Sequence, residues 1–217
     1  MGSRVNDVLW EFRAGPFTGA KGPTGPLRDA LNNAKISVRD PMSVEWDGYT
    51  PFDPGVNRPL HELSRRAAHK AFDRLMAAKD DRKESLVRLL AANGVALDDS
   101  DDGIQRLDDW FRDNVEGEAR AERLRNIWYA VVNDISLFLG DTMIKRSPNL
   151  RWEFFDKSKR DVGYQRHVIM GYTTAADPHY YVDIDMVVAT YGVRIVADLE
   201  TEPGLFVAVL AESQADA

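Results

Sequence analysis

The residues best suited to chemistry in this 217-residue chain are acidic, and they are concentrated in one stretch. Between Asp98 and Glu118 there are nine carboxylates against only two bases, Arg106 and Arg112. This stretch therefore carries the whole formal net charge of −7, and the rest of the chain is neutral. A surface that binds nucleic acid needs the opposite, a basic stripe. We therefore expect no nucleic-acid partner.

The start of the acidic stretch partly fits a calcium-binding loop. The run Asp98-Asp99-Ser100-Asp101-Asp102-Gly103, followed by Asp109, places oxygen-bearing residues and a glycine where such a loop needs them. However, the last ligand position holds Asp rather than the longer Glu, and Gln105 stands where an apolar residue is usual. Acids are also common at helix N-termini, because the helix dipole favours them there. We therefore expect a helix start rather than a calcium site.

The histidines give a second, weaker candidate for a metal site. His69 and Asp73 lie four residues apart, which on one helix face approaches the geometry of two metal ligands. A zinc site needs at least a third ligand, and the chain has no His-Glu-x-x-His motif. A hydrogen bond between His69 and Asp73 is the favoured interpretation. We expect no cofactor, and keep His61, His69 and Asp73 as the metal set of an alternative function.

Two further patterns are compatible with chemistry. Asp183 and Asp185 would share a face on a strand, where paired carboxylates hold a metal or divide acid and base roles, but they would diverge on a helix. The glycine-rich run at 15–25 lacks the order of a phosphate-binding loop, and its prolines remove backbone donors. For that run we expect a structural loop.

Apolar residues at three- and four-residue steps predict the helices that position these groups. The pattern indicates one helix from Pro59 to about Leu75 and a second from the Asp80-Asp81 caps to Asn93-Gly94. A third helix is expected over 101–115, with its acids opposite its apolar side, and a fourth over 118–145, ended by Ser147-Pro148.

After Pro148 the period changes to that of strands. Alternation over 150–154 and 164–170 predicts a hairpin, residues 180–192 fit a helix or a strand equally, and a helix is expected after Glu202. The predicted fold class is α+β: about four helices in a layer, packed on a small C-terminal antiparallel sheet.

Residues 1–58 differ from the rest in composition. They hold six of the ten prolines and seven of the fifteen glycines, together with six aromatic residues at positions 10, 12, 17, 46, 49 and 52. So many aromatics are unusual in a solvated tail. We predict an irregular lobe over 1–58, with a short helix at 27–34, packed on an α+β domain over 59–217.

The chain contains no cysteine, which fits a reducing compartment. No apolar stretch follows a basic start, and no window approaches 18 uncharged apolar residues. We expect a cytoplasmic protein without a membrane partner.

One segment resembles known sequences. The run Asn133-Asp134-Ile135-Ser136-Leu137-Phe138-Leu139-Gly140-Asp141-Thr142-Met143-Ile144, followed by Pro148-Asn149-Leu150-Arg151-Trp152-Glu153-Phe154, is similar to a pattern in uncharacterised bacterial domains. Some of these resemble immunity proteins of bacterial toxin systems. The resemblance covers about residues 120–195, carries no chemical motif, and implies a binding role.

The function expected from these observations is that of a non-enzymatic, immunity- or antitoxin-like protein that binds a basic protein. A concentrated negative field speeds encounter with a basic partner. The alternative is a metal-dependent hydrolase with its site between the N-terminal lobe and the first helix, and a third possibility is a homo-oligomeric scaffold. The acidic surface would contact the partner through Asp101, Asp102, Asp108, Asp109 and Asp113.

Overall fold

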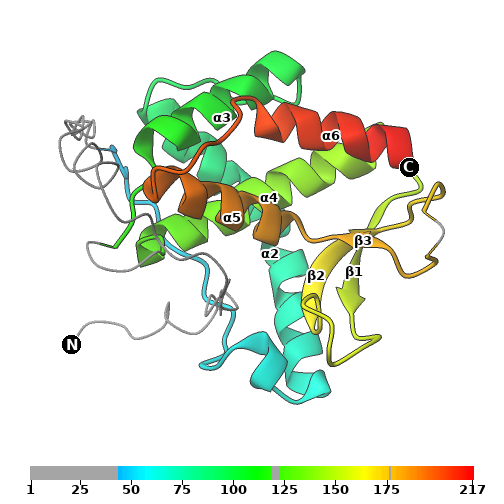
Figure 1. Ribbon diagram of the computed structural model, residues 1–217. Coiled ribbons are helices and arrows are strands. Elements are labelled where there is room, and N and C mark those ends of the chain that lie inside the picture. Colours follow the sequence, from blue (N-terminus) through cyan, green and yellow to red (C-terminus); the bar gives the residue numbers. More distant parts are fainter. Residues whose placement is uncertain (1–43, 119–122, 176) are drawn as a thin grey trace, which may run out of the picture.

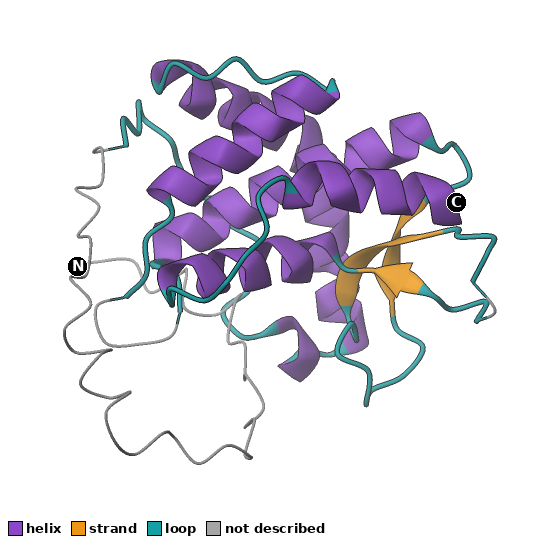
Figure 2. Cartoon of the chain, turned by 45° about the horizontal axis from the view of Figure 1, so that its top comes forward, coloured by secondary structure: helices purple, strands orange, loops and turns teal. Residues whose placement is uncertain are grey.

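The computed structural model describes residues 44–118, 123–175 and 177–217, and over these ranges the chain is α+β. Five α-helices accompany a three-stranded antiparallel sheet, which lies at one edge of the helical layer (Figures 1 and 2). This confirms the predicted fold class. The elements are η1 (Leu60–Glu62), α2 (Arg65–Ala92), α3 (Asp101–Asn114), α4 (Asn126–Arg146), β1 (Arg151–Phe155), β2 (Arg166–Met170), β3 (Tyr181–Val182), α5 (Ile184–Val196) and α6 (Leu205–Asp216).

Helix α4 is the central element. Thirteen of its residues are buried, around its whole circumference, as expected of a helix with neighbours on every side. Helices α2, α5 and α6 all pack on it. The expected start at residue 118 was wrong, because Gly117 pairs with Leu124 in an isolated bridge before the helix begins at Asn126.

The two helices expected over 59–75 and 80–93 are one continuous helix, α2. Its N-cap is Ser64, whose side chain accepts from the Ala67 backbone N–H, whereas Pro59 precedes the separate turn η1. Asp80 and Asp81 lie in the middle of α2, where Asp80 pairs with Lys83 one turn later. Residues 65–92 contain no glycine or proline. The helix therefore continues through Asp80 and Asp81, because polar residues alone do not end a helix.

The predicted hairpin is present, with β2 in the centre of the sheet. Trp152 of β1 pairs with Ile169 of β2, and Ile169 also pairs with Val182 of β3. Residues 180–192 combine both predicted alternatives. Strand β3 ends at Val182, and the Asp183 side chain caps α5 by accepting from the Met186 backbone N–H at 3.0 Å.

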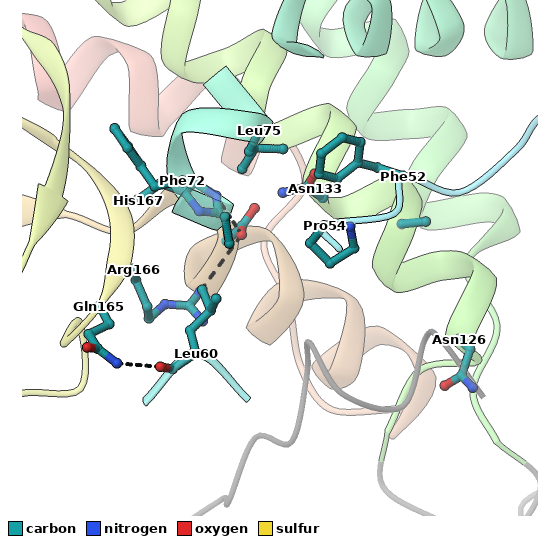
Figure 3. Close-up of a pocket in the computed structure, with 13 residues that line it drawn as sticks. Phe52, Pro54, Leu60, Phe72, Leu75, Asn126, Asn133, Gln165, Arg166 and His167 are labelled. Carbon is teal, nitrogen blue, oxygen red and sulfur yellow. Dashed lines mark hydrogen bonds and ion pairs between the residues drawn. The ribbon is translucent and has the colours of Figure 1, made fainter. Parts of the chain in front are cut away.

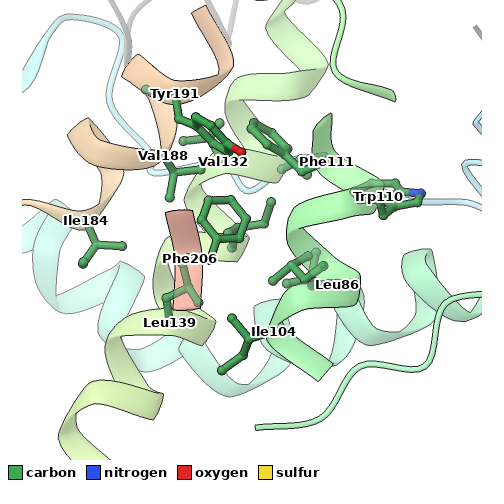
Figure 4. Packing of buried hydrophobic residues seen from close by; sticks show 14 of the residues in the cluster. Leu86, Ile104, Trp110, Phe111, Val132, Leu139, Ile184, Val188, Tyr191 and Phe206 are labelled. Carbon is green, nitrogen blue, oxygen red and sulfur yellow. The ribbon is translucent and has the colours of Figure 1, made fainter. Parts of the chain in front are cut away.

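Aromatic side chains from several helices contact one another in the hydrophobic core. Trp128 of α4 is fully buried and contacts the rings of Trp46, Trp110 and Phe111. Figure 4 shows Phe111, Tyr191 and Phe206 of three helices gathered in the same cluster. The C-terminal end of the predicted lobe thus contributes to the core through Trp46, while the expected helix at 27–34, the run at 15–25 and Trp10, Phe12 and Phe17 lie outside the described residues.

Buried charge joins α2 to α4. Arg82 binds both carboxylate oxygens of Asp134, with Nε 2.9 Å from Oδ1 and Nη2 2.5 Å from Oδ2. The hydroxyl of Tyr49 donates to the same carboxylate at 2.5 Å. Burial raises the pKa of Asp134, and the hydrogen bonds from Arg82 and Tyr49 oppose that shift. None of the described helices has the length and apolar character required to cross a membrane.

Candidate functional site

Most acids at the start of α3 are neutralised within the protein. Asp98 accepts from Arg106, Asp99 from Lys145, and Asp101 lies 2.8 Å from Arg146. Lys145 and Arg146 at the end of α4 therefore pair with Asp99 and Asp101 at the start of α3. The basic residues also suit the C-terminal end of the α4 dipole, and the acidic residues suit the N-terminal end of the α3 dipole. The local negative field is consequently weaker than the sequence alone indicated.

Asp108 does not belong to the surface, so its assignment to the partner-binding face was wrong. Its side chain is fully buried and accepts from the Tyr191 hydroxyl at 2.8 Å and from the Phe206 backbone N–H at 3.1 Å. Burial raises the pKa of Asp108. The carboxylate holds α5 and α6 against α3, which is a structural role.

Three of the predicted contact residues lie exposed along α3, namely Asp102, Asp109 and Asp113. Their spacing of seven and then four residues places them on one helix face. Asp101 is also exposed, but it is engaged by Arg146. The predicted acidic surface is therefore narrower than expected, because Asp108 is buried and the exposed Asp101 is paired with Arg146.

The calcium-like run is a helix start. The Ser100 side chain accepts from the Gly103 backbone N–H at 3.1 Å, and Asp98 Oδ1 accepts from the Ser100 backbone N–H at 2.9 Å. A Cβ on Gly103 would collide with Asp98, so glycine is needed here for close packing. Across residues 44–118, 123–175 and 177–217, no three His, Asp or Glu side chains gather as metal ligands.

The predicted metal set is dispersed. Nδ1 of His69 lies 3.1 Å from Asp73, as favoured from their spacing, and both side chains are exposed. The ring of His69 packs on Phe154, 4.9 Å between centroids. His61 lies on η1 beside Glu62, at 3.9 Å. These residues line neither of the two cavities described next.

A wide groove of about 980 Å³ runs along α5 and the segment that leads to α6. Residues 186, 190 and 194 line it, and their four-residue steps place them on one face of α5. Val162 and Tyr180 also line the groove and are 67% and 42% exposed, large values for apolar side chains in a folded protein.

Acidic residues flank this groove where α3 approaches it. Glu200 and Glu202 line the groove and are exposed. Arg112 of α3 donates to the Tyr191 hydroxyl at 2.7 Å and to Thr201 Oγ1 at 3.2 Å, both of which line the same end. Arg112 thus connects α3 to this end of the groove.

The second cavity is smaller, about 50 Å³, and lies between residues 52–60, α2, α4, β2 and α5. Figure 3 shows Phe52, Pro54 and Leu75 across from Arg166 and His167 of β2. At this polar end, His167 Nε2 lies 2.8 Å from Asp185 Oδ2, and both side chains are buried. Burial alone would raise the pKa of Asp185, but the charges of His167 and Arg166 outweigh it and lower that pKa.

Sequence reasoning found part of this cluster and missed the rest. Asp183 and Asp185 were recognised as a pair, yet Asp183 caps α5 and binds Arg166, while Asp185 turns to His167. Strand alternation puts His167 on the face opposite Val168, which left an exposed position open, but its side chain is buried. Helix α2 packs on β2, and residues on both faces of the strand are buried. The unbroken apolar run from Val168 to Met170 was the available signal.

No family model matches this chain, and neither a curated protein nor a solved structure matches it.

Proposed function

We propose that this protein is a non-enzymatic binding protein whose groove along α5 receives a basic segment of another protein. The observation that carries the proposal is the position of exposed apolar side chains, Val162 and Tyr180, in a groove whose end is flanked by Glu200 and Glu202. Apolar anchors give an interface its affinity, and complementary charge gives it speed and specificity.

The exposed face of α3 extends the same negative charge. Asp102, Asp109 and Asp113 would attract a basic partner towards the groove without entering it. An immunity-like role, as the resemblance over residues 120–195 implies, is one form of this function: the protein would cover a basic surface of a toxin. The alternative of a metal-dependent hydrolase finds no supporting ligand cluster among the described residues.

Selection from a random peptide display library tests the groove directly. We expect enriched peptides to combine Lys or Arg with an aliphatic or aromatic anchor. Thr190→Arg, at an exposed position in the groove, should weaken the selected peptides at least about tenfold, through its bulk and like charge. Val87→Arg, an apolar residue 40% exposed on α2, is the matched control and should leave their affinity unchanged.

Enrichment of acidic peptides, or equal binding to the Thr190→Arg variant, would overturn the proposal. The α3 acids are tested by rate measurements with the same peptides. Neutralising Asp102, Asp109 and Asp113 to Asn should slow association and flatten its salt dependence, with little change in dissociation. Neutralising three exposed acids of α2, at positions 73, 80 and 81, changes the net charge equally and should have a smaller effect.

A further inference from the structure

The groove along α5 borders an open edge of the sheet. The strand order is β1-β2-β3, so β2 covers one edge of β3 and no described strand covers the other. Four consecutive residues line the groove here: Tyr180, Tyr181, Val182 and Asp183. Successive residues of a strand point to opposite faces of the sheet, and Tyr181 packs on Phe155 while Val182 packs against the main core. Because both nevertheless line the groove, the groove meets β3 at its edge and not on one face.

This edge carries backbone groups that β2 does not pair. Tyr181 and Val182 lie opposite Met170 and Ile169 of β2. In an antiparallel ladder, a residue with both backbone groups on the partner strand alternates with one whose N–H and C=O are directed away. One of the two residues of β3 therefore directs its N–H and C=O towards the groove. Outside the ladder with β2, no hydrogen bond from a described residue reaches the backbone of either one.

These backbone groups distinguish between the shapes that a bound segment can take. A helix satisfies its own backbone hydrogen bonds, so a helix lying in the groove would cover the N–H and C=O of β3 without pairing them, which is costly. An extended segment beside β3 pairs with both groups and becomes a further strand, about 4.8 Å from β3. The open edge therefore favours an extended occupant.

The course of the groove indicates where the basic residue of such a segment lies. In both views α5 continues from β3 with little change of direction (Figures 1 and 2), so a segment paired with β3 is led along α5. From Met186 to Arg194 the helix rises roughly 12 Å, which an extended chain covers with about four residues. There Arg194 Nη2 donates to the Glu200 carbonyl at 2.6 Å. Among the exposed charged residues of the lining, Glu200 and Glu202 outnumber Arg194 by one, and a single Lys or Arg balances them.

We propose that the partner segment binds in an extended conformation, as a fourth strand of the sheet paired with the open edge of β3. A Lys or Arg of this segment lies about four residues from its paired residue, beside Glu200 and Glu202. The inference rests on the proposed function, because it specifies the conformation of the basic segment that the groove receives. Alternate side chains of a strand share a face, so the apolar anchors of the segment are two residues apart and not three or four.

Backbone N-methylation of a peptide selected on the intact protein tests this conformation. An N-methyl group at the residue whose N–H donates to β3 should weaken binding at least about tenfold. The same group at either neighbouring residue, whose N–H points away from β3, should change the affinity by less than about threefold. The neighbouring positions are thus the matched controls. Similar losses at consecutive residues, as a bound helix would show, would overturn the inference.

NMR of the complex with the wild-type protein provides a second measurement. Backbone protons of Tyr181 or Val182 should show NOEs to backbone protons of the peptide, as between paired strands. Contacts through side chains alone contradict the pairing.

The inference and the proposed function fail in different ways. If no basic peptide is enriched, both are wrong. If basic peptides are enriched and Thr190→Arg weakens them, but they bind as helices, the function of the groove stands and the pairing with β3 is wrong.

Discussion

Neighbouring aspartates on α3 have opposite roles, which a charge count does not distinguish. Asp109 is exposed and accepts from Gln105 at 2.9 Å, whereas Asp108 is buried and joins Tyr191 and Phe206 to α3. One residue along a helix is a rotation of about 100°, enough to move a side chain from solvent to the core. Their substitutions should therefore differ sharply.

We predict that Asp108→Ala lowers the free energy of unfolding by about 2–4 kcal/mol, because the Phe206 backbone N–H loses its acceptor and the Tyr191 hydroxyl keeps only the Glu202 carbonyl, at 3.3 Å. Asp109→Ala, the adjacent control, should change it by less than about 0.5 kcal/mol. Urea unfolding followed by circular dichroism measures both. Equal effects would contradict the structural role assigned to Asp108.

Between elements, charge and close packing align α4 with α2 and the sheet. Asp141 accepts from Lys79 at 2.5 and 2.6 Å, from Lys83, and from Trp152 Nε1 at 2.9 Å. Gly140 adjoins the same tryptophan, and a Cβ at this position would collide with the Trp152 ring. The residues that connect α4 to β1 thus include a glycine and an aspartate that are adjacent in the sequence.

Replacing one partner of the buried ion pair between Arg82 of α2 and Asp134 of α4 should destabilise the protein more than replacing both. Arg82→Met leaves Asp134 buried without its cation, and we expect a loss of about 3–5 kcal/mol in the free energy of unfolding. The double variant Arg82→Met, Asp134→Leu should recover most of that loss, because no uncompensated charge remains. A double-mutant cycle by urea unfolding measures the coupling, and additive losses would argue against the pair.

The contacts of Asp141 predict that the stability of the protein depends on pH in the acidic range. Burial alone would raise the pKa of Asp141, but hydrogen bonds from Lys79, Lys83 and Trp152 lower it below the unfolded value of 3.8. A carboxyl with a lowered folded pKa stabilises the protein above its unfolded pKa, and this contribution is lost as the pH falls through the folded pKa. The stability difference between wild type and Asp141→Asn should thus be full at neutral pH and shrink below about pH 4. Unfolding at several pH values, with Asp81→Asn as exposed control, measures it.

Gly140→Ala tests the contact of helix and sheet. Alanine is normally the better helix former by about 1 kcal/mol. Here we expect the reverse, a loss of about 1–3 kcal/mol, because the methyl group forces Trp152 or α4 to move. Thermal unfolding provides the comparison, and a stabilised variant would show that the ring yields easily. Gly94→Ala is unsuitable as a control because its φ of 74° favours glycine.

At the scale of the whole molecule, α4 is the element on which the other described helices and the N-terminal segment pack. Its Trp128 touches Trp46 of the N-terminal segment and two aromatic residues of α3, while Phe206 and Leu210 of α6 belong to the same core. The C-terminal helix also returns to the sheet side, since the backbone N–H of Thr173 donates to the Asp216 carbonyl at 3.2 Å. A destabilising substitution in the core of α4 should therefore affect all the described elements together.

We predict that Trp128→Ala costs about 3–5 kcal/mol and that the protein still unfolds in one transition. Because the same side chain supports several elements, helix content and the fluorescence of the remaining tryptophans should be lost together. Separate midpoints for the two signals would show that the described residues contain more than one cooperative unit.

The α+β class, the hairpin and most helix positions followed from periodicity, because spacing of apolar residues reports which side of an element is buried. The boundaries at Ser64 and Asn126 did not follow, since several polar residues competed as caps and packing selected among them. The resemblance and the expected immunity-like role stay predictions.

Sequence patterns also located the acids on α3 and paired Asp183 with Asp185. They could not show that Lys145 and Arg146 neutralise α3, that Asp108 points inward, or that His167 of β2 reaches Asp185 of α5. Each of these contacts joins elements separated along the chain, and local periodicity holds no information about which distant element covers a given face. Charge compensation and both cavities arise from that packing alone.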